Sequence, residues 1–550
     1  MNALSLFVVL QMLILVVLDL VVPHKNSLGV VGVTYWSLLW LTLFVYTGYA
    51  LTRLSHTLIQ SRMWITTIVA LLYLGTFIVS LPDARHLSGE STREISCVIA
   101  HLTNTKDMGF SSVCHLGYPA RQFYIPAVPT MLFGRSLVAL QTGSLLYFIA
   151  GFIVFVRGLV IANKRHKHAD LTGGIILTTL FHFHMATYIV LTFEQAVYPM
   201  SFGMFTVGLW LTWLHERSTV VLLLLGLIQL ILIHSYTPAL AVMALNLLLF
   251  LVFAYEAYRQ KSKRWVLFIV IFFVSCLSLW VSVQTRSDIR ILTTKTPITF
   301  EMVFTTLGET WRHIVYKSGT IPWTSPMFTL PFVGTLALGL LGVFGLPISV
   351  ITLWILTVIA VAVISNGYAS GSVDYKLQRA TVMIPYFLAL LTEISKYIRV
   401  PKKILIVIIF LFSITGIGTF MDIRSKKQDM HQVMLARFLA PHIPTSEQKG
   451  IWVGTIFIAS DVSPYIKADN FEDAALYFLP GWHGKMKHLQ EKEEGGCRLE
   501  KGIWVIPSSH PCSRSLQSSG RAKRWDTGWF PEIKDKTKGI AVDLLSIEYP

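Results

Sequence analysis

The polar segment that follows residue 81 carries three carboxylates within a dozen residues: Asp83, Glu90 and Glu94. A carboxylate beside an apolar run can act as general base toward a hydroxyl, or can hold a divalent cation such as Mg²⁺ or Mn²⁺. Both roles need a partly dry site, because water dissipates the charge. Since Arg85 and Arg93 lie beside these acids, a solvated, salt-bridged loop is the competing interpretation.

Basic residues that suit a phosphate ligand precede a late apolar run, at Lys376 and Arg379. Arginine offers a bidentate fork and lysine a compact charge, so both can bind an anionic headgroup. Arg121, in the same polar loop as the three acids, is a further candidate for binding phosphate. Snorkelling of these long side chains toward a membrane surface would explain the same pattern.

Aromatic and polar residues near the ends of apolar runs are candidates for binding a substrate: Tyr118, Tyr124, Glu194, His234 and Arg312. Polar groups at such depth usually face protein or water, although an interfacial aromatic belt would explain the tyrosines and the region around Arg312. The chain has no Gly-rich phosphate loop, GxSxG elbow, HExxH or CxxC pair. The candidate residues are therefore chosen by chemical type and position in the chain, and they match no known motif.

Apolar runs dominate the elements that must position these residues. The 550 residues are 53% hydrophobic and 14% charged, whereas a soluble chain has about 25% charged residues. Runs of about 20 apolar residues recur, each long enough to cross a hydrocarbon core of roughly 30 Å. They predict an all-α polytopic membrane bundle of about 13 transmembrane helices, near residues 4–22, 30–50, 63–81, 136–160, 171–192, 199–214, 218–234, 237–256, 265–283, 327–344, 346–365, 380–397 and 403–421.

Short basic connectors indicate the orientation of this bundle. They fall on one side of it, around Arg53 and Arg62 and within 164–167, 259–264 and 396–403. The positive-inside rule makes that side cytoplasmic, together with the N-terminus, and it explains the net charge of +16 without nucleic acid. Arg424, Lys426 and Lys427 argue against this orientation, because they directly follow the last span and would lie on the external side. A single miscounted helix would move the C-terminal region to the other side.

The predicted organisation has two parts. Residues 1–425 form the transmembrane domain, with outer loops at 82–135, 284–326 and 366–379, and residues 426–550 form a small extracytoplasmic α/β domain. In the second part, Gly450–Ala459 and Gly502–Pro507 have the pattern of strands and 470–477 that of an acidic helix. Two cysteine pairs, Cys97 with Cys114 and Cys497 with Cys512, fit disulfides in an oxidising compartment, with free thiols as the alternative.

The end of the first outer loop carries a resemblance to a known family. An aromatic, proline-containing stretch from Gly117 to Pro126 is followed by Leu132-Phe133-Gly134-Arg135-Ser136-Leu137, which opens the next span. Together with the acidic loop, this pattern resembles the membrane glycosyltransferases of the GT-C superfamily, in particular the protein O-mannosyltransferase and aminoarabinose transferase branch. The resemblance covers about residues 80–160. The family's usual Asp-Glu dipeptide is missing, although Glu90 and Glu94 precede Ala100-His101-Leu102.

The resemblance implies an integral membrane enzyme with an external active site and a polyprenyl-phosphate sugar donor. It also implies a catalytic carboxylate in the first outer loop, with Glu90 preferred over Asp83 and Glu94, and a donor-phosphate contact at Arg379. The acceptor would be a lipid, a glycan or a protein. A transporter or lipid-linked-sugar flippase, a lipid-carrier glycan polymerase or ligase, and a non-catalytic scaffold are the alternatives, although no inverted repeat supports a transporter.

Overall fold

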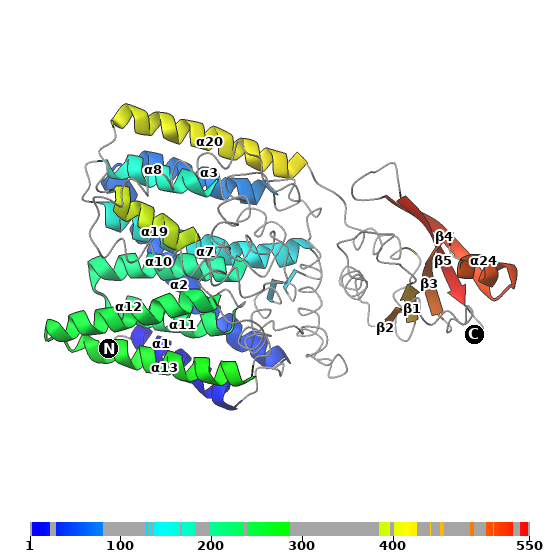
Figure 1. The fold of residues 1–550 in the computed structure, drawn as a ribbon, viewed down its shortest axis with the longest axis horizontal. Coiled ribbons are helices and arrows are strands. Elements are labelled where there is room, and N and C mark those ends of the chain that lie inside the picture. Colours follow the sequence, from blue (N-terminus) through cyan, green and yellow to red (C-terminus); the bar gives the residue numbers. More distant parts are fainter. Residues whose placement is uncertain are drawn as a thin grey trace, which may run out of the picture.

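The computed structural model describes part of the chain, namely residues 3–21, 29–80, 128–129, 132–133, 137–164, 168–181, 197–235, 239–285, 384–395, 401–425, 441, 452–455, 485–488, 502–509, 511–531 and 539–547. The described residues form a bundle of apolar helices and a separate small sheet (Figure 1). The first half of the bundle consists of α1 (Ala3–Val21), α2 (Gly29–Gln60), α3 (Trp64–Ser80), α7 (Leu137–Asn163) and α8 (Ala169–Leu180). It continues with α10 (Val197–Glu216), α11 (Thr219–Ile233), α12 (Ala239–Arg259), α13 (Arg264–Thr285), α19 (Ile384–Ser395) and α20 (Lys402–Ser425).

The predicted spans and the described helices agree closely. Each span that falls on described residues overlaps a helix, although those near 171–192 and 380–397 are described only in part. The spans near 327–344 and 346–365 lie outside the described residues, so the total of 13 stays a prediction. The end of one span was wrong, because α2 runs to Gln60 and not to residue 50, which places Arg53 inside a helix and not in a connector. Hydropathy marks where lipid contact ends, and the helix continues because no glycine or proline interrupts it between Leu51 and Gln60.

Apolar side chains cover much of the outer surface of the bundle. Leu13, Leu71, Phe273 and Phe410 are 57–64% exposed, and water would oppose so large an apolar surface. By length and composition, three described helical segments can cross a membrane: Gln141–Asn163, Val242–Arg259 and Arg264–Val281. Lipid is the solvent that suits this surface, and the chain is an integral membrane protein.

Helices α7 and α10 pack at very short range because glycines line their contact. A Cβ atom added at Gly158 would lie 2.7 Å from the carbonyl oxygen of Gly208, and one added at Gly151 would lie 2.6 Å from that of Ser201. A Cβ atom at Gly208 would overlap the carbonyl of Val154. In lipid, the hydrophobic effect does not drive two helices together. The van der Waals contact that this close approach permits stabilises the pair instead.

Gly208→Ala is therefore expected to destabilise the bundle by about 1–3 kcal/mol, because α7 must move away from α10. The control is Gly48→Ala in α2, where an added Cβ atom meets nothing within 4 Å. That change should leave stability equal or slightly higher, since alanine favours a helix more than glycine does. Unfolding in detergent micelles measures both variants, and equal stabilities would contradict this account of the contact.

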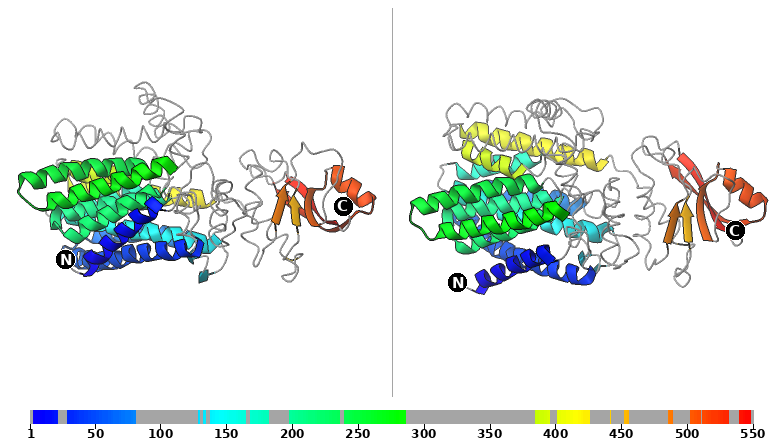
Figure 2. Two further views of the ribbon diagram at one scale, coloured as in Figure 1. Left: turned by 90° about the horizontal axis from the view of Figure 1, so that it is seen from below. Right: turned by 60° about the horizontal axis from the view of Figure 1, so that its bottom comes forward.

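The C-terminal part contains a five-stranded sheet with the strand order β2-β1-β3-β5-β4. Its strands are β1 (Trp452–Thr455), β2 (Lys485–His488), β3 (Gly502–Pro507), β4 (Ala522–Pro531) and β5 (Gly539–Ile547). The first three run parallel, and β5 lies antiparallel to both β3 and β4. Helix α24 (Pro511–Ser518) lies beside this sheet (Figure 2). Its Leu516 belongs to one buried cluster with Trp504 and Leu545 of the sheet.

The two strands predicted from the sequence coincide with β3 and contain β1, whereas β4 and β5 were not predicted. The acidic stretch 470–477 lies outside the described residues, and the domain boundaries stay a prediction. Cys512, at the start of α24, is disulfide-bonded, and its partner lies outside the described residues. Pairing with Cys497 therefore stays a prediction, as does the pair Cys97 and Cys114, whereas Cys276 in α13 is a free thiol.

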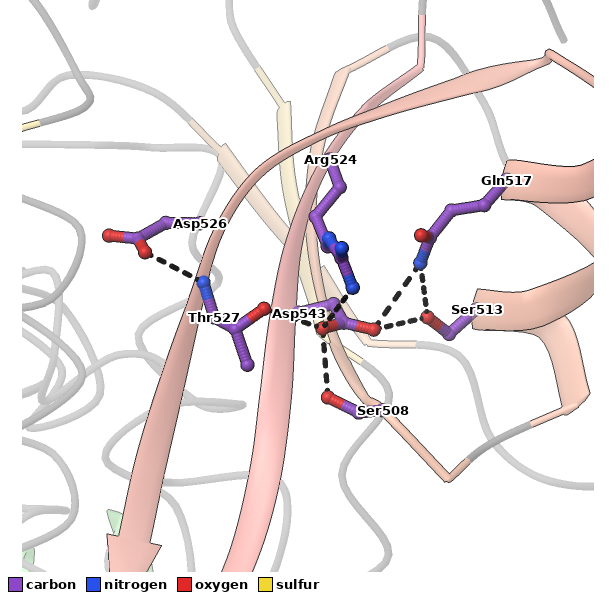
Figure 3. A network of polar contacts seen from close by, with 7 residues as sticks. All are labelled: Ser508, Ser513, Gln517, Arg524, Asp526, Thr527 and Asp543. Atoms are coloured by element: carbon purple, nitrogen blue, oxygen red, sulfur yellow. Dashed lines mark hydrogen bonds and ion pairs between the residues drawn. The ribbon is translucent and has the colours of Figure 1, made fainter.

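Asp543 of β5 is a buried carboxylate that ties α24 to the sheet (Figure 3). It accepts hydrogen bonds from the hydroxyl groups of Ser513 (2.6 Å), Ser508 (2.8 Å) and Thr527 (3.0 Å). Burial alone would raise the pKa of Asp543, but these three hydrogen bonds and the nearby charge of Arg524 outweigh it and hold the pKa below its ordinary value. The ionised carboxylate is thus the form that the fold stabilises.

Candidate functional site

The bundle has one end that collects basic residues, which we call the basic end: the turns at 61–63, 217–218 and 260–263 and the start of α8. The Asp170 carboxylate accepts hydrogen bonds from the backbone N–H groups of Ile65 (3.0 Å) and Thr66 (2.7 Å), so the starts of α3 and α8 lie side by side. The three turns place Arg62, Arg217 and Lys261 at positive φ. The N-terminus lies at this end too (Figure 1).

The opposite end of the bundle is here called the far end, and the predicted acidic segment attaches there. The chain leaves α3 at Ser80 and enters α7 at Leu137 there, and it leaves α20 at Ser425 there (Figures 1 and 2). Helix α19 begins at Ile384 within the bundle, and this first residue is the end of the helix that is nearer to the far end (Figure 1). The acidic segment follows Ser80 at the far end, whereas the basic segment precedes Ile384, where α19 begins within the bundle (Figure 1). This geometry is compatible with a shared site between them.

Nearly all of the predicted site residues lie outside the described residues. These are Asp83, Glu90, Glu94, Tyr118, Arg121, Tyr124, Glu194, Arg312, Lys376 and Arg379. Their roles, and the convergence of the acids with the basic residues, stay predictions.

His234 is the predicted site residue whose position is described. It follows the last turn of α11 at the far end and is 1% exposed. Its ring meets the Trp36 ring of α2 edge to face, with 5.6 Å between the ring centres. His234 is thus part of a packed contact between two helices, directly below the far end, and its role in binding a substrate stays a prediction.

Aromatic and polar side chains continue from His234 into the bundle. Trp40 lies one helical turn beyond Trp36 and contacts Tyr147 of α7. The Trp40 ring also stacks on the Phe202 ring of α10, with 5.3 Å between the centres of these two rings. The hydroxyl oxygens of Ser144 and Tyr198 lie 3.4 Å apart, fully buried. These residues form a layer of packed aromatic side chains between the far end and the interior of the bundle.

A buried polar network holds α19 in place. The Asn246 side chain on α12 accepts hydrogen bonds from Trp210 Nε1 (3.1 Å) and the Tyr386 hydroxyl (3.4 Å), and donates one to Gln229 Oε1 (2.9 Å). Four helices, α10, α11, α12 and α19, therefore meet at one amide. Helix α19 begins five residues after Arg379 in the sequence, so this network anchors the described helix that follows the predicted phosphate contacts.

Asn246→Leu keeps the volume but leaves three buried polar groups without their partner, so we expect a loss of about 2 kcal/mol. Asn163→Leu is a matched control, because Asn163 is equally buried and neither of its amide atoms has a hydrogen-bond partner in the described part of the chain. Its replacement should be neutral or stabilising. Thermal unfolding in micelles measures both, and an equal loss in the two variants would show that volume and not the network matters.

An ion pair between a buried arginine and an exposed glutamate at the basic end was not predicted. Arg157 of α7 is 2% exposed, and its guanidinium donates to Glu216 Oε1 (2.7 Å) and to the Tyr46 hydroxyl (2.9 Å). It also lies 5.2 Å from the centre of the Tyr49 ring. A single charge within an apolar run was the available signal. Arg157 joins α2, α7 and α10 at the end opposite to the predicted site, which indicates a structural role.

No group of three or more His, Cys, Asp or Glu side chains that could hold a metal ion occurs within the described residues. A divalent cation at the acids of the first outer loop stays a prediction, since those residues lie outside that part.

Comparison with known proteins gives structural likeness alone. No protein-family model matches the chain, and no curated protein matches it. Two crystal structures of ArnT from Cupriavidus metallidurans are similar at 9% sequence identity. The apo structure has a TM-score of 0.39 and aligns over 88% of this chain and 98% of ArnT, and the structure bound to undecaprenyl phosphate has a TM-score of 0.41 over 87% and 98%. Likeness at this level assigns neither family nor activity, so the functional conclusion depends on the residues of this chain.

Proposed function

We propose that the chain is an integral membrane glycosyltransferase that moves a sugar from a polyprenyl-phosphate donor to an acceptor at the far end of the bundle. The observation that supports this proposal is that the acidic segment follows the end of α3 at the far end, opposite the basic end, and that the basic segment precedes the end of α19 that is nearer to the far end (Figure 1). By the positive-inside rule the basic end faces the cytoplasm, so the reaction would take place on the external side. The C-terminal region would lie there too, because α20 ends at the far end.

The proposed reaction is a direct displacement at the anomeric carbon. A carboxylate of the first outer loop, Glu90 first and Asp83 or Glu94 otherwise, takes the proton of the acceptor hydroxyl. The acceptor oxygen forms a bond to the sugar while the bond from the sugar to the phosphate oxygen breaks, which inverts the anomeric carbon. The lipid phosphate leaves with its negative charge held by Arg379 and Lys376.

The remaining predicted residues would bind the substrates around this centre. Arg121 would add a further positive charge for the phosphate, and Tyr118, Tyr124, Glu194, His234 and Arg312 would bind the sugar and the acceptor. The polyprenyl tail would stay in lipid beside the apolar helices, since its transfer to water is unfavourable. This division explains why the chemistry would require a membrane bundle.

A transfer assay with the full chain in lipid vesicles tests the proposal. Polyprenyl-phosphate donors with different sugars are supplied in turn, together with lipid, glycan and protein acceptors, and release of the lipid phosphate is measured with sugar transfer. The expected result is equimolar release and transfer with at least one donor. Movement of the intact lipid-linked sugar across the bilayer, without cleavage of any donor, would support a flippase and refute the enzyme.

A further inference from the structure

Strand β4 presents two large aromatic side chains to solvent at the edge of the C-terminal sheet. It is the last strand in the order β2-β1-β3-β5-β4, so in the described residues it pairs on one side, with β5. Trp525 is 38% exposed and Trp529 is 54% exposed. Exposed edge strands and exposed aromatic clusters are both unfavourable in water unless a partner uses them.

Positive charge accompanies these tryptophans. Arg521, Lys523 and Arg524 lie within the same turn and strand, and Asp526 is the carboxylate among residues 521–531. The Arg524 side chain is 55% exposed and forms an ion pair with Asp543, with 3.9 Å between Nη1 and Oδ1. That distance is long for an ion pair and leaves much of the guanidinium open to a second anion. Arg521, Lys523, Arg524, Trp525 and Trp529 together define the β4 edge.

The strand register places part of this set on one face. Arg524 is opposite Leu545 and Trp529 is opposite Ala541 on β5, and residues an even number apart on a strand share a face. Between them the register shifts at Arg524/Asp526, a bulge that leaves Trp525 as the extra residue. A basic and an aromatic side chain thus project from the same side of the edge strand.

We propose that the β4 edge docks on an anionic lipid bilayer. Tryptophan favours the level of the lipid headgroups, and arginine and lysine are attracted by their phosphates. The chain is tethered to a membrane through α20, so the bilayer surface is always at high local concentration. Charge complementarity therefore favours lipid over a neutral glycan or an apolar protein surface. Docking would be independent of the proposed glycosyl transfer.

Hydrogen exchange in the full chain tests this docking. The chain is reconstituted in nanodiscs of phosphatidylcholine alone or of phosphatidylcholine with about one third phosphatidylglycerol, and amide exchange is followed over residues 521–531. We expect exchange of this segment to be about tenfold slower in the anionic nanodiscs, and to return to the zwitterionic rate at high salt. The peptide covering α24 should exchange equally in both, which verifies that the sheet is folded.

Two variants separate charge from folding. Lys523→Glu and Trp529→Ser should each abolish the protection in anionic nanodiscs. Arg514→Glu makes the same charge change as Lys523→Glu on the exposed side of α24, outside the β4 edge, and should retain it. Equal exchange of 521–531 in the two lipid mixtures would overturn the proposal. Equal protection in detergent micelles without lipid would also overturn it, since the partner would then be the chain itself.

Discussion

Glu90→Gln is expected to reduce the rate of sugar transfer by about 10²–10⁴-fold, because the amide cannot take a proton from the acceptor hydroxyl. The loss should appear in kcat, with little change in KM for the donor, since the side chain acts on the acceptor in the transition state. Arg379→Ala should also lower kcat/KM, by about 100-fold, and Arg379→Lys should restore part of it because lysine keeps the charge and loses the bidentate contact.

The matched control for Glu90→Gln is Glu256→Gln, an exposed glutamate near the end of α12 on the basic side of the bundle. It should retain full activity. If Glu90→Gln is fully active, Asp83→Asn and Glu94→Gln identify which of the other two acids is the base. Full activity in all three variants, measured with the same donor, would exclude Asp83, Glu90 and Glu94 as the general base.

Asp543→Ala is expected to destabilise the C-terminal sheet by about 3 kcal/mol, because the buried hydroxyl of Ser513 and the less buried hydroxyls of Ser508 and Thr527 lose their acceptor. Amide exchange of β5 and α24 in the full chain measures this loss locally. The control is Asp526→Asn on the neighbouring strand, where the exposed carboxylate contacts the backbone N–H of Thr527. That variant should change the free energy of opening by less than about 0.5 kcal/mol.

The lowered pKa of Asp543 makes this contribution depend on pH. The unfolded pKa is about 3.9, so the contribution is complete well above that pH. It is lost as the pH falls from there through the lower pKa of the folded state, because the unfolded chain then binds the proton more readily. Asp543→Asn should remove this acid-dependent part. If amide exchange of β5 depends on acid equally in Asp543→Asn and in the unchanged chain, another titrating group must cause that dependence.

The helices of the bundle could be predicted because most of them are long, apolar and flanked by polar residues. The limits of α1, α3, α11 and α13 lie within a few residues of the expected spans. The extension of α2 to Gln60 could not be predicted from hydropathy, because its last turns lie beyond the apolar run. The strands β4 and β5 were missed because their exposed and buried residues do not alternate regularly, and a bulge interrupts β4.

The polar contacts inside the bundle depend on helix rotation, which hydropathy does not reveal. Asn246 meets Tyr386, 140 positions further along the chain, and Arg157 meets Tyr46, 111 positions away. Neither partner can be chosen from the sequence without knowing which helices are neighbours. The candidate site could be predicted as residue types in loops. The helices now show that the acidic loop follows α3 at the far end and that the basic loop precedes a helix that begins within the bundle (Figure 1).

The distance between the acidic and basic segments tests the proposed site most directly. Spin labels on p-acetylphenylalanine introduced at Ser91 and Leu377, in the full chain in nanodiscs, report this distance by pulsed electron paramagnetic resonance without involving the native cysteines. A shared pocket at the far end predicts a distance below about 20 Å, well under the roughly 30 Å of the hydrocarbon core. A main population beyond that thickness would place the two segments apart and contradict the proposed active site.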